Sequence, residues 1–64
     1  MHIQLQNGKM LNTYYVNNIK QNFKDRNKVV IELTNGTYIT EGSYSSEEEA
    51  EKRVTELRSQ LLGK

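Results

Sequence analysis

The sequence contains no cysteine, no proline and no tryptophan, and its only histidine is His2. Without cysteine the chain cannot form a disulfide, and nothing in it indicates an oxidising compartment. A single histidine is too few for a metal site of ordinary affinity, which needs several nitrogen or sulfur ligands. We therefore expect neither a bound metal nor a cofactor.

Long apolar runs and a strong charge of one sign are also missing. No apolar stretch approaches the length of a signal peptide or a membrane span, so the expected location is the cytoplasm, with no membrane partner. The formal net charge is only +1, whereas nucleic-acid-binding domains usually carry a much larger basic excess. The 64 residues leave room for one core, so residues 1–64 are predicted to form a single domain. A monomer of this size is marginally stable. Because disulfides and a metal site are excluded, self-association is the remaining way to stabilise it.

Two Asn-Gly pairs, Asn7-Gly8 and Asn35-Gly36, organise the chain. Each pair separates two segments of alternating apolar and polar residues, and the sequence around the first, 3–12, is repeated around the second, 31–40. Asn-Gly is the strongest short-range signal for a two-residue hairpin, because a type I′ turn needs positive φ at both central residues. The sequence predicts two β-hairpins with type I′ turns.

A two-residue turn determines which residues face each other across a hairpin. It places Leu5 opposite Met10 in the first hairpin and Leu33 opposite Tyr38 in the second. Because side chains alternate between the faces of a sheet, one face collects the predicted core. That core consists of Ile3, Leu5, Met10, Val29, Ile31, Leu33 and Tyr38. The reverse face is predicted to carry Leu11, Val30 and Ile39 among polar neighbours.

The segment between the hairpins, 14–23, is predicted to be a further strand that pairs with residues 29–33. Tyr15, Ile19 and Phe23 share one side of it at even spacing. Asparagine is a poor strand former, so we expect a bend near Asn17 and Asn18.

Residues 45–62 are predicted to form a C-terminal helix. Ser46 with Glu49, or Ser45 with Glu48, makes a capping box, and Glu49 and Arg53 are spaced for a surface ion pair. The apolar stripe of this helix is Ala50, Val54, Leu57 and Leu61. The expected fold class is therefore α+β: an antiparallel β-meander of four to five short strands in residues 1–44, packed on one helix.

Residues that could carry catalysis are scarce. Nucleophilic catalysis needs a base beside the nucleophile, but the chain offers one N-terminal histidine and no cysteine. The acidic residues Glu47, Glu48, Glu49 and Glu51 lie at a helix start, where they stabilise the helix dipole. We expect a protein that is not an enzyme, with no catalytic residues and no small-molecule substrate.

Protein binding is the function that the sequence favours most. Leu11, Val30 and Ile39, with Glu32 beside them, are predicted to lie on the sheet face that the helix cannot cover. An exposed apolar patch on a marginal monomer is typical of an association surface. We expect a homodimer or a complex with a host or accessory protein, formed on that face or on an open strand edge. A phage or mobile-element protein that blocks a host factor is the alternative protein-binding class.

Nucleic-acid binding is a further alternative. Lys20, Lys24, Arg26 and Lys28 flank Phe23, so one hairpin tip is basic and contains an aromatic residue that could stack on a base. The interpretation we favour places Phe23 in the core and treats the basic residues as ordinary turn residues, because Asp25 lies in the middle of the patch.

Several short motifs follow one another along most of the chain. They are Leu5-x-Asn-Gly-Lys9, Asn12, Tyr15-Val-x-x-Ile19 and Val30-Ile-x-Leu-Thr-Asn-Gly-x-Tyr38, with Glu41 and Ser43 before the terminal helix. In this order they resemble the small FlbD-type proteins of flagellar operons, also called swarming-motility proteins. The resemblance implies a non-catalytic cytoplasmic accessory protein that acts through protein contacts.

Overall fold

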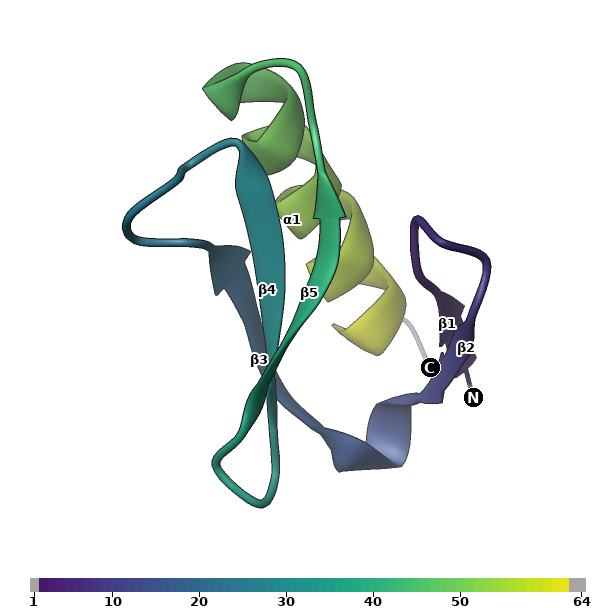
Figure 1. Cartoon of the computed structure of the whole chain (residues 1–64). Helices are drawn as coiled ribbons and strands as arrows, with labels where there is room; N and C mark the ends of the chain where they lie inside the picture. The colour runs from purple at the N-terminus through teal and green to yellow at the C-terminus, as the bar shows by residue number, and fades with distance from the viewer. Residues whose placement is uncertain (1, 63–64) are drawn as a thin grey trace.

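Five strands and one long helix follow each other along the chain in the computed structural model, which describes residues 2–62. They are β1 (His2–Gln4), β2 (Met10–Asn12), the short 3₁₀ helix η1 (Thr13–Tyr15), β3 (Val16–Gln21), β4 (Lys28–Leu33), β5 (Tyr38–Ser43) and α1 (Glu47–Leu62). The strands form two antiparallel sheets, β1-β2 and β3-β4-β5. Helix α1 packs along one side of the larger sheet, and the β1-β2 hairpin lies beside the C-terminal half of α1 (Figure 1). The predicted α+β class with a C-terminal helix is confirmed.

The sheet is divided rather than one continuous meander. Asn12 ends β2 and begins η1, because its side chain accepts a hydrogen bond from the Tyr14 N–H at 3.0 Å. The chain therefore turns away before it can pair β2 with β3. The two sheets are joined instead through Gln6, whose side-chain amide donates to the Ser43 carbonyl oxygen and accepts from the Ser43 N–H, both at 2.8 Å. Gly42 permits this approach, since a Cβ there would lie 2.5 Å from Gln6 Oε1.

Both Asn-Gly hairpins are present, but the predicted type I′ turns are wrong. Gly8 and Gly36 have φ values of 92° and 88°, whereas no described non-glycine residue has positive φ. In the second hairpin the Gly36 N–H donates to the Leu33 carbonyl oxygen and the Leu33 N–H donates to the Thr37 carbonyl oxygen. This is a three-residue loop, a type I turn followed by a glycine bulge, and the first hairpin has the same pattern.

The extra loop residue shifts both registers by one position. Ile3 lies opposite Leu11, and Ile31 lies opposite Ile39. A one-residue shift moves a side chain to the other face of a sheet. Met10 and Tyr38, which were predicted in the core, are therefore 59% and 51% exposed. Leu11 and Ile39, which were predicted on the reverse face, pack against the core instead.

Strand β3 pairs with β4 as predicted, but it is shorter than the predicted 14–23, because Tyr15 belongs to η1 and is 52% exposed. The register shifts between Val16 and Asn18, which agrees with the expected bend at the asparagines. Ile19 is fully buried at the centre of the strand, as its position in the alternation requires.

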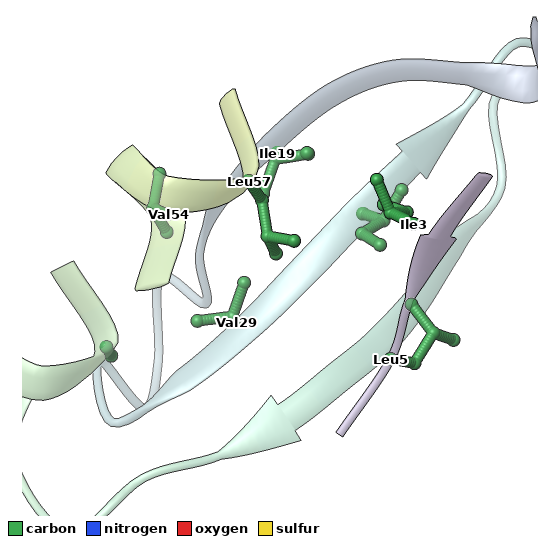
Figure 2. Close-up of a cluster of buried hydrophobic side chains, with 8 residues drawn as sticks. Ile3, Leu5, Ile19, Val29, Val54 and Leu57 are labelled. Carbon is green, nitrogen blue, oxygen red and sulfur yellow. The ribbon is translucent and has the colours of Figure 1, made fainter. Parts of the chain in front are cut away.

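The core lies between the sheets and α1. It contains Ile3, Leu5, Ile19, Val29, Ile31, Ala50, Val54 and Leu57. Figure 2 shows this cluster, with Leu57 projecting from the helix toward the strands. The predicted helical stripe is thus the buried face of α1, with Leu61 partly buried at its end.

The helix begins at Glu47, and Ser46 caps it. The Glu49 N–H donates to Ser46 Oγ at 3.1 Å, which is one of the two hydrogen bonds of the first predicted capping box, Ser46 with Glu49. The Glu49 carboxylate accepts from the Ser45 N–H and hydroxyl rather than binding Arg53. Those hydrogen bonds lower the pKa of Glu49.

Candidate functional site

A buried ion pair joins β5 to α1, and the sequence analysis missed it. Glu41 is 1% exposed, and its Oε2 accepts from Arg53 Nε at 3.1 Å and from Arg53 Nη2 at 2.9 Å. Its other oxygen accepts from the Tyr44 hydroxyl at 2.6 Å. Arg53 also donates to the Gln4 carbonyl oxygen at 2.9 Å, so the same guanidinium contacts β1. This cluster holds both sheets and the helix together.

The electrostatics of this cluster indicate a structural role. Burial, and then the hydrogen bond to the Glu41 carboxylate, raise the pKa of Tyr44 to about 12. Partial burial disfavours the charge on Arg53, but hydrogen bonds to Glu41 and Glu56 outweigh it and raise the pKa of the guanidinium. No buried side-chain nitrogen or oxygen among residues 2–62 lacks a hydrogen-bond partner. The cluster therefore contains no unpaired buried polar group that a ligand could bind.

The predicted aliphatic interface patch does not form an exposed surface. Leu11 and Ile39 pack against the core, and Val30 is only 8% exposed although it lies on the reverse face. Glu32 is partly exposed beside Tyr38, its partner in the β4-β5 register. Whether any of these four residues contacts a protein stays a prediction.

The strand edges are covered at several points. The Ile19 N–H donates to Asn18 Oδ1 and the Ile19 carbonyl accepts from Arg58 Nε, both at 2.9 Å, on the outer edge of β3. On the outer edge of β5, Gln6 binds the Glu41 carbonyl and both backbone groups of Ser43. Backbone groups that are satisfied in this way cannot pair with another strand, so these positions do not take part in edge pairing. Binding at the rest of the strand edges stays a prediction.

One exposed apolar surface lies on the reverse face and includes Phe23; Tyr14 and Leu62 are large apolar side chains exposed elsewhere. Phe23 is 85% exposed, so the expectation that it belongs to the core is wrong. It borders a hollow of about 320 Å³ on the reverse face of the three-stranded sheet. We call the residues lining this hollow the Phe23 surface: Lys20, Asn22, Phe23, Val30 and Tyr38.

Hydrogen bonds hold the turn that carries Phe23. Asn22 Oδ1 accepts from the N–H groups of Lys24 and Asp25 at 2.8 and 3.0 Å. The Asn22 N–H donates to the Lys28 carbonyl oxygen, and the Lys28 N–H donates to the Asp25 carbonyl oxygen. The β3-β4 loop extends away from the sheet and helix, at the left in Figure 1. Phe23 is therefore held in solvent by an ordered turn, which reduces the entropy lost on binding.

Two of the four basic side chains near Phe23 already interact with other side chains. Arg26 Nε forms an ion pair with Glu47 at 3.0 Å. The Lys20 ammonium lies 5.0 Å from the centre of the Tyr38 ring, at the distance of a cation–π contact. Of the five nucleic-acid candidates, only Lys20 and Phe23 line the hollow. A second, more polar hollow of about 540 Å³ brings Lys20, Phe23 and Arg26 together beside α1.

Four other hollows border α1. The largest of these four is lined only by α1 residues between 48 and 60, so it runs along the outside of the helix. Within residues 2–62 there is no group of three or more metal-ligating acidic, histidine or cysteine side chains. Nor does the described part of the chain contain a helix with the length and apolar character to cross a membrane.

Comparison with protein-family models, curated proteins and solved structures finds no match. The resemblance to FlbD-type proteins therefore rests on its motifs alone and stays a prediction.

Proposed function

We propose that this protein is a non-catalytic binding module that contacts another protein chain through the Phe23 surface. The observation that carries the proposal is the 85% exposure of Phe23 on a hydrogen-bonded turn, beside the half-exposed ring of Tyr38. Fully burying a phenylalanine is worth roughly 1.5–3 kcal/mol, and the fold gains almost none of this from Phe23. A contact surface would recover it.

The lining of the 320 Å³ hollow favours a protein partner over a nucleic acid, whereas the 540 Å³ hollow that Phe23 also borders carries Lys20, Arg26 and Arg58. Of its five residues only Lys20 is charged, and its ammonium already lies over Tyr38. Polyanion binding draws its affinity from several cations that neutralise phosphates. Here Arg26 is paired with Glu47, and Asp25 lies in the same turn.

Photo-crosslinking in the source cells tests this proposal. A benzophenone-bearing residue replaces Phe23 in one variant and Tyr14 in the matched control, because Tyr14 is also an exposed aromatic, at 78%, on η1. We expect protein adducts from position 23 that are absent or much weaker from position 14. An adduct with a different protein would identify a host or accessory partner. The proposal fails if position 23 gives no more adduct than position 14.

Nucleic-acid binding is the second candidate, because an exposed Phe23 is available to stack on a base. A gel shift with single-stranded DNA and RNA at low salt tests it. A shift that weakens with added salt and is lost in the Phe23→Ala and Lys24→Ala variants supports this candidate. Absence of a shift at low salt removes it.

A further inference from the structure

We infer that the protein chain bound by the Phe23 surface is a second copy of this chain, in a symmetric face-to-face dimer of the three-stranded sheets. This inference rests on the proposed function and names its partner. In a two-fold contact, the same surface of both copies must be complementary to itself. The reverse face meets this requirement along strand β4. Lys20, which pairs with Val30 on the same face, would come near Lys20 of the other copy, but each ammonium is directed to the Tyr38 ring of its own copy.

The two ends of the reverse face carry opposite charges. Lys28, Val30 and Glu32 alternate along β4, so they share this face with Val30 in the middle. When β4 of a second copy lies antiparallel across Val30, Lys28 of each copy lies opposite Glu32 of the other. Packed sheets cross at about 30°, which keeps these ends within reach of each other.

The aromatic residues follow the same pattern. Phe23 lies at the Lys28 end, because the neighbouring Asn22 bonds to Lys28, and Tyr38 lies at the Glu32 end, because it pairs with Glu32. The antiparallel contact therefore places the Phe23 end of one copy over the Tyr38 end of the other. Closing the two faces removes exposed surface of both rings from water.

The size of the face predicts a reversible dimer. A standard interface takes about 800 Å² from each partner. That would be nearly a fifth of the 4374 Å² surface of this chain. Three strands of six residues span only about 15 by 20 Å, or about 300 Å², which is well under half of this standard. We expect a monomer–dimer equilibrium that depends on concentration rather than an obligate dimer.

Sedimentation equilibrium of the full chain, from roughly 10 µM to 1 mM, tests the inference. Lys28→Glu places like charges opposite each other and should weaken dimerisation at least about tenfold. The double variant Lys28→Glu/Glu32→Lys restores opposite charges and should recover most of that loss. Phe23→Ala should also weaken the dimer. Lys9→Glu and Tyr14→Ala are the matched controls, since both residues are exposed and lie outside this face.

Circular dichroism melting of each variant verifies that it folds, and the double variant keeps the test valid if a single variant is unstable. Dimerisation that is weakened by Lys28→Glu, recovered by the double variant and unaffected by the controls supports the inference. A chain that is monomeric at every concentration overturns it. So does a double variant that dimerises no more strongly than Lys28→Glu. If the chain is monomeric but position 23 still crosslinks a different protein, this inference fails while the proposed function stands.

Discussion

Arg53 lies on the buried side of α1, one turn after Ala50 and one turn before Leu57. A charged residue within an apolar stripe needs a buried partner of opposite sign. That signal was present in the sequence, but Arg53 also fitted a surface pair with Glu49, one turn earlier. The partner Glu41 could not be found, because it is the extra residue at the irregularity of β5 between Thr40 and Gly42. A side chain at such an irregularity does not follow simple alternation.

The buried pair predicts a large difference between two arginine substitutions. Arg53→Ala leaves the Glu41 carboxylate buried without its cation, and we expect a loss of about 3 kcal/mol in the free energy of unfolding. Arg26→Ala is the control, because the Arg26–Glu47 pair is more than half exposed on both sides, and it should cost less than about 1 kcal/mol. Urea unfolding measures both. Equal losses would show that Glu41 is not buried as described.

Tyr44 makes the stability depend on pH in the alkaline range. Its pKa is about 12 in the folded state against 10.0 for an unperturbed tyrosine. Its stabilising contribution is therefore complete below pH 10 and is lost as the pH rises through about 12, because the unfolded chain releases the proton first. The Tyr44→Phe variant has no hydroxyl at this position, so it lacks this pH-dependent contribution to stability. Urea midpoints from about pH 9 to about pH 12 should fall more steeply for the wild type than for Tyr44→Phe, and parallel curves would contradict the hydrogen bond to Glu41.

At the scale of elements, the two hairpins show where sequence reasoning succeeds and where it stops. Asn-Gly locates both turns, but it is compatible with a two-residue type I′ turn and with a longer loop that ends in a glycine bulge. The two alternatives differ by one residue in register. The observed pairs Ile3–Leu11 and Ile31–Ile39 place two aliphatic side chains together in the core. The predicted register would instead have put Met10 and Tyr38 on the core face, in place of Leu11 and Ile39. Comparing core quality between registers would have identified the right one.

Asn35→Gly distinguishes the two turn types by the sign of its effect. Asn35 Oδ1 accepts from the Thr37 N–H at 3.0 Å and from the Thr37 hydroxyl at 2.7 Å. Its φ is not positive, so glycine brings only lost hydrogen bonds and added chain entropy, and we expect about 1 kcal/mol of destabilisation. Asn35→Asp keeps the acceptor and serves as the control in thermal unfolding. A type I′ turn would instead be stabilised by glycine, so a raised melting temperature would contradict this hairpin geometry.

At the scale of the whole molecule, composition and periodicity were enough to predict an α+β fold in which the helix covers one side of the strands. The stripe of Ala50, Val54 and Leu57 and the alternation around Ile31 carry that result, because burial of apolar area determines both. The proposed contact surface could not be predicted in the same way. Phe23 follows the even spacing of a strand, but hydrogen bonds to Asn22 turn the chain there and leave the ring in solvent.

The central claim is that Phe23 stands exposed on a contact surface while Leu11 and Ile39 face the core. Paramagnetic relaxation by a soluble gadolinium chelate, measured by NMR on the intact chain, tests it directly. In dilute solution we expect strong relaxation of the Phe23 and Tyr38 rings and weak relaxation of the Leu11 and Ile39 methyl groups. On concentration, the two rings should become protected while Tyr14 stays exposed. Relaxed Leu11 and Ile39 methyl groups, with a Phe23 ring already protected at dilution, would contradict both the register and the surface.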